Sequence, residues 1–266
     1  MIDKQTTLSG LVKQIPSGSI LALGGMTNYR RPLAFVKALI RHYLDRGEPK
    51  NLTLLCFTAG LESDLLIGAG MVSRVRSCYF GLEIFGLAPM FTYHANRGDI
   101  EVIEETEASI ANGLRATLAG IGFMPARAWI GTDLPKLRPD VRTITDPYTG
   151  ETLIAFPAIK ADFSVIHALQ ADPEGNAFIG KNKGVDEELS VAGKKVIITT
   201  EEVVPLIERA NLIAPFTYAV VHAPQGALPT SCHPLYQIDG KAMLSYVEQV
   251  SDPDSFKVFL TEFLKF

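Results

Sequence analysis

The sequence predicts an α/β protein with an open, mostly parallel sheet covered by helices. Two observations carry this prediction. Short apolar or β-branched runs alternate with amphipathic segments along the chain, and the runs are bounded by glycine or other turn residues. Alternation of this kind is typical of parallel strands joined by helical crossovers. With 266 residues, the chain is long enough for one domain, 1–266, with a sizeable core.

The first elements follow from local patterns. Apolar residues at helical spacing predict helices at Leu8–Ile15 and Leu33–Tyr43, and a shorter helix at Asp64–Ala69 that Gly70 ends. Between these helices lie runs that are apolar enough for strands buried on both faces. The predicted strands are Ser19–Leu23, Leu52–Phe57 and the more polar Val72–Tyr79.

The second half continues the alternation. Glu101–Ile103 is predicted to be a short strand, and Ala108–Ala119 a helix with apolar residues four apart on one face. Residues 131–150 are rich in Pro, Asp and Arg, so we expect a long surface excursion within the domain. Short β-branched runs then predict three further strands, Phe163–His167, Lys195–Thr199 and Ala219–His222.

Composition excludes several classes of function. The 25 basic and 29 acidic residues give a net charge of −4, which provides no electrostatic drive toward nucleic acid or an anionic membrane. No segment is apolar enough to span a bilayer, and the first residues lack a signal-peptide pattern. We therefore expect a cytoplasmic protein that binds neither nucleic acid nor membrane.

The cysteines and histidines do not form a recognisable chemical motif. Cys56, Cys78 and Cys232 lack CxxC spacing, so they indicate reduced thiols, and the first two are expected to be buried. His167 and His222 each end a predicted strand, where hydrogen-bonded core histidines are common. No spacing of His, Asp or Glu resembles a metal site, and no GxSxG nucleophile motif occurs. We expect no bound metal.

The segment after the first strand is the main candidate for a ligand site. Gly24 and Gly25 end the strand and are followed by Thr27, Asn28, Tyr29 and Arg30, before Pro32 opens the next helix. A strand that feeds a helix in this way places backbone N–H groups at the carboxyl edge of a sheet, where open α/β sheets bind ligands. Two glycines permit positive φ and the close approach of a ligand. The alternative interpretation of the same residues is a tight turn between strand and helix, with arginines at the surface and no ligand.

The absence of two motifs narrows the class of ligand that this segment could bind. Neither the dinucleotide fingerprint GxGxxG nor the P-loop pattern occurs here. The main sequence evidence for a nicotinamide site or a nucleoside triphosphate site is therefore missing.

Several stretches together resemble a known family. "LALGGMTNYRRPLAFVKAL" is similar to the glycine-rich loop of the α subunit of family I coenzyme A transferases, with glutaconate CoA-transferase as the nearest type. Other stretches agree in order along nearly the whole chain: "LLIGAGMVSRVRSCY", "RGDIEVIEETEASIANGLRATLAGIGFMPAR", "VIHALQADPEGNAFI", "KKVIITTEEVV" and "GALPTSCHPLY". The resemblance implies a CoA-transferase-like fold, of the NagB/RpiA/CoA-transferase type.

The resemblance also implies a function and a partner. The chain would pair with a β subunit of similar fold, as an α/β heterodimer or heterotetramer. A glutamate on that β subunit would attack the acyl-CoA, forming an acyl-glutamyl anhydride and then an enzyme–CoA thioester. Coenzyme A would be a substrate, with no permanently bound cofactor. The loop, with Gly24, Gly25, Tyr29 and above all Thr27, Asn28 and Arg30, would line the substrate site, and Arg30 would lie partly exposed near the acyl carboxylate.

Glu83 departs from the family pattern. It stands where glutaconate CoA-transferase has a serine that contacts substrate, between apolar neighbours in "CYFGLEIFGLAPMF". A carboxylate among apolar side chains is costly to bury unless it is paired or protonated. We expect Glu83 to be a catalytic acid or base. A glutamate that points into water, or that pairs with Arg31, is the alternative.

Glu107 is the second catalytic candidate. It lies in the acidic segment "EVIEETEAS", of which most glutamates should form a solvated face. In the ring-opening hydrolase relatives, a glutamate of this segment carries chemistry, and Glu107 matches it best. A favourable interaction with the N-terminus of the following helix explains a glutamate there equally well.

Three functions therefore stay open. The first is the α subunit of a CoA-transferase acting on a short-chain, dicarboxylic acyl-CoA. The second is a CoA-thioester decarboxylase or C–C-cleaving hydrolase on the same scaffold. The third is a non-catalytic acyl-CoA-binding subunit. The β-subunit sequence would discriminate between the first two.

Overall fold

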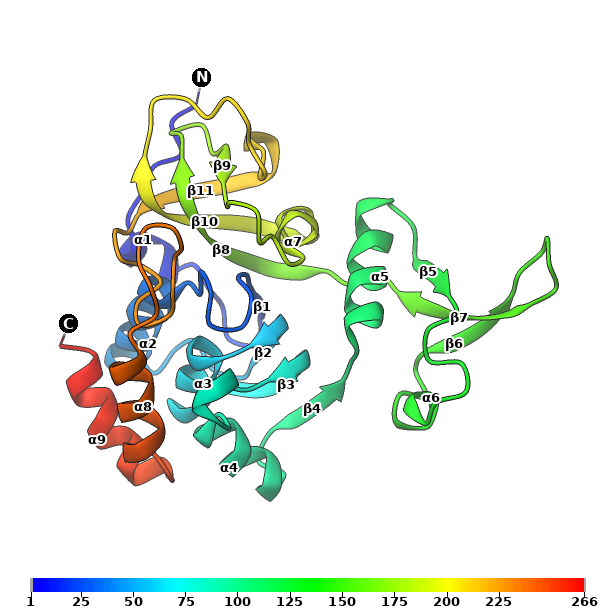
Figure 1. Ribbon diagram of the computed structural model, residues 1–266, viewed down its shortest axis with the longest axis horizontal. Helices are drawn as coiled ribbons and strands as arrows, with labels where there is room; N and C mark the ends of the chain where they lie inside the picture. The colour runs from blue at the N-terminus through cyan, green and yellow to red at the C-terminus, as the bar shows by residue number, and fades with distance from the viewer. Residues whose placement is uncertain (1, 266) are drawn as a thin grey trace.

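The computed structural model describes residues 2–265 and confirms an α/β fold with a mostly parallel sheet (Figure 1). The eight-stranded sheet has the order β11-β10-β8-β1-β2-β3-β4, with neighbouring strands of this path parallel, and β9 pairs antiparallel with β8. Its strands are β1 (Ile20–Leu23), β2 (Leu52–Ala59), β3 (Val72–Phe80), β4 (Glu101–Glu104), β8 (Ala161–Ala171), β9 (Ala177–Phe178), β10 (Gly193–Val203) and β11 (Thr217–His222).

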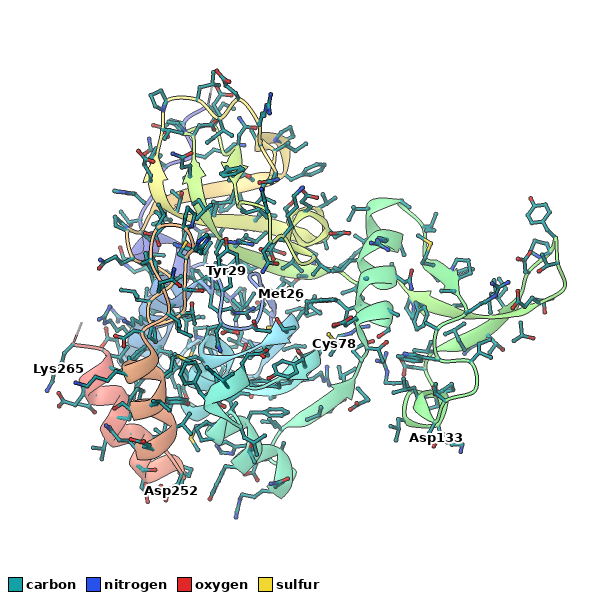
Figure 2. All side chains as sticks on the ribbon, in the orientation of Figure 1. Met26, Tyr29, Cys78, Asp133, Asp252 and Lys265 are labelled. Atoms are coloured by element: carbon teal, nitrogen blue, oxygen red, sulfur yellow. The ribbon has the colours of Figure 1, made fainter. Side chains whose placement is uncertain are left out.

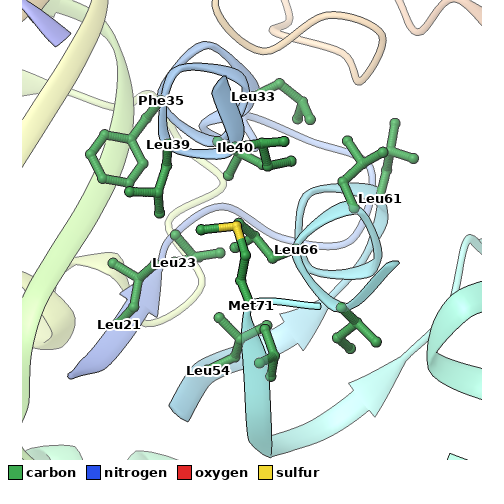
Figure 3. Packing of buried hydrophobic residues seen from close by; sticks show 14 of the residues in the cluster. Leu21, Leu23, Leu33, Phe35, Leu39, Ile40, Leu54, Leu61, Leu66 and Met71 are labelled. Atoms are coloured by element: carbon green, nitrogen blue, oxygen red, sulfur yellow. The ribbon is translucent and has the colours of Figure 1, made fainter. Parts of the chain in front are cut away.

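Helices cover both faces of this sheet. One apolar core lies under α1 (Leu8–Val12), α2 (Leu33–Arg46), α3 (Leu61–Gly68), α4 (Pro89–Arg97), α8 (Gly240–Gln249) and α9 (Pro253–Phe263). The other lies under α5 (Glu107–Leu118) and α7 (Asp186–Ala192). Figure 3 shows the first core, where Leu39 and Ile40 of α2 and Leu66 of α3 pack over Leu21 of β1 and Leu54 of β2.

The strand order creates a topological switch beside β1. The chain runs from β1 through β2 and β3 to β4 on one side, and β8 then pairs with the other side of β1. In open α/β sheets, ligands bind in the crevice outside the carboxyl ends of strands at such a switch. The segment that leaves β1 therefore occupies the position at which a ligand site is expected.

The predicted surface excursion is larger than expected and has regular structure. Strands β5 (Phe123–Ala126), β6 (Arg142–Thr145) and β7 (Thr152–Pro157) form a separate antiparallel sheet, and α6 (Leu134–Leu137) lies between β5 and β6. These residues project from the body of the molecule as an arm (Figure 1). Strand β6 is exposed along its whole length, so it gave no sequence signal, whereas β7 buries Ile154 and Phe156 and its alternating pattern was missed.

A buried carboxylate anchors the arm. Glu105, which immediately follows β4, accepts hydrogen bonds from Arg76 of β3 at 2.7 Å and Arg138 of the arm at 2.8 Å. Arg138 also pairs with Asp140, which raises the pKa of its guanidinium further above the ordinary value. The expectation that this acidic segment is mostly solvated is wrong for Glu105, whose exposed fraction is 4%.

Several predicted elements are shifted or were missed. Helix α1 is shorter than predicted, and Leu118, expected on the apolar face of α5, is 42% exposed. No prediction covered α4, α8 or α9. A signal existed for α9, because the Asp252 side chain caps Ser255 in a capping box and Pro253 stands in the first turn.

Asp64 of α3 ties two of the missed helices to the sheet. Its buried carboxylate accepts hydrogen bonds from the Tyr246 hydroxyl of α8 at 2.5 Å and from the backbone amides of Met90 and Phe91 in α4 at 3.2 and 2.5 Å. Burial raises the pKa of Asp64 to about 6, although these hydrogen bonds oppose the shift.

This shift predicts a pH-dependent contribution to stability. Because the pKa of Asp64 is higher in the folded state than its ordinary value of 3.8, its contribution is complete below that value and is lost as pH rises through about 6. The free energy of unfolding of wild type, minus that of Asp64→Asn, should fall by about 2 kcal/mol between pH 4 and pH 7. Urea denaturation at several pH values measures this difference. A difference that rises with pH, or stays constant, would contradict the assignment.

Candidate active site

The segment that leaves β1 folds into a tight turn at the carboxyl edge of the sheet. Met26 and Tyr29, labelled in Figure 2, exchange backbone hydrogen bonds of 3.0 and 2.9 Å. Thr27 and Arg30 have left-handed backbone conformations, with φ values of 47° and 52°. Non-glycine residues adopt this conformation rarely, and such strain persists where surrounding contacts enforce it. We call residues 24–31 the β1 loop.

The two glycines are required by the protein's own packing. A Cβ atom on Gly24 would lie 2.8 Å from a carboxylate oxygen of Asp186. Gly25 has a φ of 87°, and a Cβ atom there would lie 2.6 Å from the carbonyl oxygens of Tyr29 and Arg30. The atoms that approach these glycines most closely therefore belong to the protein itself.

A buried ion pair holds the β1 loop in this shape. Asp186, at the start of α7, accepts a hydrogen bond from the Gly25 amide at 3.0 Å and from the Arg30 guanidinium at 2.9 Å. Arg30 also donates to the carbonyl oxygens of His167 at 2.6 Å and Asn182 at 2.9 Å. Both ionic side chains are almost completely buried. Buried charges are tolerated when they are paired and hydrogen-bonded in this way.

The expectation of exposed arginines in this loop is wrong. Arg30 has an exposed fraction of 0%, and its guanidinium pairs with the buried carboxylate of Asp186. Arg31 is equally buried and pairs with Glu62 of α3, which excludes the suggested pairing with Glu83. Glu62 also accepts hydrogen bonds from the Gly60 amide and the Ser63 hydroxyl.

A second segment, residues 223–236, is hydrogen-bonded to the β1 loop although it lies far from it in the sequence. The carbonyl oxygen of Ser231 accepts a hydrogen bond from the Arg30 amide at 2.8 Å, and the Ser231 amide donates to the carbonyl oxygen of Asn28 at 2.9 Å. The segment is itself held by Glu201 of β10, which accepts hydrogen bonds from the Gln225 amide at 2.6 Å and the Tyr236 hydroxyl. Residues 223–236 are therefore part of the site's framework.

His167 belongs to the same framework. Its Nε2 lies 2.7 Å from Glu201 and its Nδ1 lies 2.8 Å from the Thr199 hydroxyl. Burial lowers the pKa of His167, so the neutral ring can donate to Glu201 and accept from Thr199. Burial alone would raise the pKa of Glu201, but the bonds from His167 and Tyr236 lower it. The prediction of a hydrogen-bonded core residue is confirmed for His167. His222 is hydrogen-bonded, to the Glu201 carbonyl oxygen at 3.2 Å, but it is exposed, so its predicted place in the core is wrong.

Tertiary structure also gathers three potential metal ligands that the sequence spacing did not reveal. Ligand atoms of His167, Glu201 and Cys232 lie within 4.8 Å of one another. These groups fit a metal poorly as they stand, because His167 and Glu201 are bonded to each other and burial raises the pKa of the Cys232 thiol to about 12. Cys56 and Cys232 are buried, whereas Cys78 is only partly buried.

The other side of the β1 loop faces the ends of β2 and β3. The Thr27 amide donates to the Thr58 hydroxyl of β2 at 2.7 Å, and the Asn28 side chain donates to the Leu82 carbonyl oxygen at 3.1 Å. Leu82 immediately precedes Glu83, so these bonds place Thr27 and Asn28 beside the turn that carries Glu83. The structure thus brings together the loop and the carboxylate that sequence reasoning selected separately.

Glu83 lies exposed on a strained turn. Its φ is 58°, and its amide donates to the Tyr79 hydroxyl at 3.3 Å. The neighbouring Ile84 is 92% exposed, so the apolar neighbours do not enclose the carboxylate. A Cβ atom on Gly81 would lie 2.7 Å from the same hydroxyl, so a larger residue there would displace the Tyr79 side chain. A charged side chain held outward by a strained backbone is an arrangement common at functional sites.

Glu107 is the first residue of α5 and is exposed there. It lies close to Cys78 of β3: burial is the main reason that the pKa of this thiol rises to about 11, and the Glu107 charge adds to it. The structure is consistent with both interpretations of Glu107, because an exposed carboxylate at a helix N-terminus is favourable without any catalytic role.

The residues that sequence reasoning missed are the supporting ones. Asp186 lies 156 residues from Arg30, and Glu201 lies 34 residues from His167. No local spacing connects members of such pairs. A buried arginine in a glycine-rich loop does require a carboxylate partner, but the sequence does not say which carboxylate supplies it.

Comparison with known proteins defines the class. The family model for coenzyme A transferase matches residues 6–222. The chain is 30% identical to the A-subunit of 3-oxoadipate CoA-transferase from Pseudomonas knackmussii, over 100% of this chain and 94% of the relative. It is 31% identical to the IpdA subunit of a cholesterol ring-cleaving hydrolase from Rhodococcus jostii, over 98% and 92% of the two chains.

Solved structures agree with these matches. Glutaconate coenzyme A-transferase from Acidaminococcus fermentans superposes with a TM-score of 0.89 and 27% identity, over 98% of this chain and 88% of the other. The decarboxylase AibA/AibB superposes with a TM-score of 0.88 and 29% identity, over 98% and 100% of the two chains. The chain belongs to the coenzyme A transferase family and is an enzyme subunit of the A-subunit type.

The 3-oxoadipate CoA-transferase and ring-cleaving hydrolase relatives are each named as one subunit of an enzyme. Among residues 2–265, each helix is too short or too polar to cross a lipid bilayer.

The buried pair of Asp186 and Arg30 predicts a large loss of stability on truncation. Asp186→Ala leaves the Arg30 charge buried without a carboxylate, so we expect the free energy of unfolding to fall by about 3–5 kcal/mol. Glu151→Ala is the matched control, because it removes an exposed ion pair with Arg127 and should cost less than about 1 kcal/mol. Urea denaturation of both variants measures the difference. Similar losses in the two variants would show that the pair does not hold the loop.

Proposed function

We propose that this chain is the α subunit of a heteromeric CoA-transferase that acts on a short-chain, dicarboxylic acyl-CoA, with the nucleophilic glutamate on the partner subunit. Family membership supports the reaction class. The relatives named for 3-oxoadipate and glutaconate support a dicarboxylic acyl group. Their designation as one lettered subunit of an enzyme supports a partner of the same family.

The observation that carries the proposal is the exposed carboxylate of Glu83 beside the β1 loop. Asn28 joins the loop to the Glu83 turn through the Leu82 carbonyl oxygen. The loop is held rigid from behind by Asp186 and Ser231, so its outer side keeps one shape. A second subunit that covers this edge would meet a fixed surface beside which the Glu83 carboxylate is exposed.

Each residue then has a distinct role. In the proposed mechanism, Glu83 exchanges a proton with the acyl group or the leaving group, as a general acid or base. Thr27 and Asn28 line the acyl side of the loop. Arg30 is a positioning residue, because its two terminal nitrogens donate to Asp186 and to two carbonyl oxygens and so hold the loop rather than the substrate.

A decarboxylase or C–C-cleaving hydrolase is the second candidate. The similarity to a ring-cleaving hydrolase subunit and to the decarboxylase AibA/AibB favours it, because both share the full length of this fold. In that case the carboxylates of this chain, Glu83 and Glu107, would carry more of the chemistry. A covalent intermediate on the partner separates the two candidates.

The role of Glu83 predicts a loss of turnover without a loss of binding. In the complex with the partner subunit, Glu83→Gln should lower kcat by about 10²–10⁴ and leave KM within a few-fold, because the amide keeps the shape but does not transfer protons. Glu104→Gln, at the exposed end of β4, is the control and should retain full activity. An unchanged pH profile of kcat in Glu83→Gln would remove this residue from the mechanism.

The transferase mechanism predicts where a covalent adduct forms. After incubation of the complex with an acyl-CoA, mass spectrometry of the separated subunits should show a CoA adduct on the partner and none on this chain. A glutamate-to-alanine change at the modified partner residue should abolish both the adduct and the transfer. Turnover without any adduct would favour the decarboxylase or hydrolase instead.

A further inference from the structure

Strand β6 forms an open edge of the arm's sheet. In the order β5-β7-β6, only one side of β6 is paired, and all four of its residues are exposed. The arm projects from the body of the molecule, so this edge lies away from the main sheet (Figure 1). An open edge presents unpaired N–H and C=O groups, and proteins usually block or cover such an edge because it can pair with another strand.

The opposite edge of the same sheet, β5, is blocked by a proline. The Ala158 amide bonds to the Gly122 carbonyl oxygen at 2.9 Å, so these two residues form a hydrogen-bonded pair at the start of β5. Because such pairs alternate along antiparallel strands, the backbone nitrogen of Pro125 points away from β7 and has no N–H to offer. Strand β6 contains no proline, so its edge is the one open to pairing.

The direction of each backbone group on β6 follows from its pairing with β7. The Asp146 amide donates to the Glu151 carbonyl oxygen at 2.8 Å, just beyond the end of the strand. By alternation, the backbone of Ile144 also faces β7, whereas Thr143 and Thr145 direct their amides and carbonyls to the open edge. Among residues 2–265, no further strand pairs with that edge.

The edge is complementary to itself in the antiparallel orientation. Residues 142–146 read R-T-I-T-D, which places opposite charges at equal distances from the central Ile144. In an antiparallel pair of two copies centred on Ile144, Arg142 of each copy lies opposite Asp146 of the other. The same register sets Thr143 opposite Thr145, so the outward backbone groups of the two copies meet.

The neighbouring registers fit less well. A pair centred on Thr145 sets Pro147, which lacks an N–H, opposite Thr143. A pair centred on Thr143 requires the Val141 amide, which already donates to the Arg138 carbonyl oxygen at 3.0 Å. A shift by a single residue would oppose inward and outward backbone groups. The register with matched charges is therefore also the one with matched hydrogen-bonding groups.

Both charges are available for a pair between copies. Arg142 is exposed, and its side chain has no hydrogen-bonding or ionic partner among residues 2–265. Asp146 accepts a hydrogen bond from the Tyr148 amide at 2.8 Å, which holds the pKa of its carboxyl below the ordinary value. Arg127, whose charge also acts on Asp146, is itself paired with Glu151.

An apolar contact lies at the centre of the same register. Ile144 pairs with Leu153 of β7, so both side chains lie on the face of the arm's sheet opposite to the buried Ile154 and Phe156. Because the Ile144 backbone faces its own β7, the two copies of Ile144 would meet as a non-hydrogen-bonded pair, in which side chains approach closely.

We propose that β6 pairs antiparallel with β6 of a second copy of this chain, in the register centred on Ile144. The two three-stranded arms then form one six-stranded sheet, and a two-fold axis passes between the copies. This inference goes beyond the proposed function and does not depend on which reaction the enzyme performs. It assigns the contact between two heterodimers to the arm.

Sedimentation velocity of the full-length chain in complex with its partner subunit tests the inference. The wild-type particle should contain two copies of this chain. Arg142→Glu sets a glutamate opposite Asp146 at both ends of the pair, so the dissociation constant for self-association should rise at least tenfold. Arg142→Lys keeps the charge and should self-associate as wild type does. A wild-type particle with one copy, or unchanged self-association in Arg142→Glu, would overturn the proposal.

A matched control reverses the charge of another exposed arginine. Arg209 lies in the loop after β10, on the body of the molecule, and has no side-chain partner among residues 2–265. Arg209→Glu should leave self-association unchanged. Equal weakening in Arg209→Glu and Arg142→Glu would show that net charge, rather than the β6 edge, controls association, and would also overturn the proposal.

Cross-linking tests the register itself. Residues of a non-hydrogen-bonded pair have Cα atoms about 4.5 Å apart, which suits a disulfide. Under mild oxidation, Ile144→Cys should therefore form a covalent dimer of this chain. Tyr148→Cys is the control: the side chain there is 95% exposed, but the two copies of Tyr148 would lie at opposite ends of the pair and should not cross-link. No dimer in Ile144→Cys, or equal yields in both variants, would contradict the register.

The outcomes separate this inference from the proposed function. Loss of self-association with CoA-dependent turnover retained leaves the proposed function in place, and a wild-type dimer without turnover leaves the arm interface in place. If Arg142→Glu instead releases the partner subunit from the complex, the edge belongs to that partner and the pairing of two copies is overturned.

Discussion

The site depends on one buried ion pair, between Arg30 and Asp186. A buried charge without a partner is strongly unfavourable, so the two side chains must meet for the sheet to fold with this loop on its edge. Asp186 also accepts the amide of Gly25, which joins the start of the loop to its end. The pair thus converts a flexible glycine-rich turn into a rigid one, at the point where the strand order reverses.

Rigidity at this edge fits a scaffold on which different reactions occur. The strained residues Thr27, Arg30 and Glu83 lie in the loop or in the turn that it contacts, and all have left-handed backbones. The framework behind them comes from α7, from β10 and from residues 223–236. Transferase, hydrolase and decarboxylase relatives are similar to this chain over nearly its whole length, so the shared fold does not by itself fix the reaction.

The overall fold could be predicted because its signals are local. The run Ile20–Leu23 is a strand because it is apolar throughout, and α2 is a helix because its apolar residues recur at helical spacing. Strand β6 of the arm could not be predicted in the same way, because it has no buried face and the place of the arm depends on Glu105 and Arg138. The candidate site was located from Gly24 and Gly25, but the burial of its arginines was not foreseen.

By itself, the sequence determined the parallel α/β architecture, the glycine-rich loop after β1 and the family to which the chain belongs. Only the tertiary structure decided that Arg30 turns inward to Asp186, that Glu83 stands exposed beside Asn28, and that β6 forms an open edge of the arm's sheet. The physical reason is distance along the chain. Hydrophobic periodicity is a property of neighbouring residues, whereas the partner of a buried charge lies 156 residues away and is selected by packing.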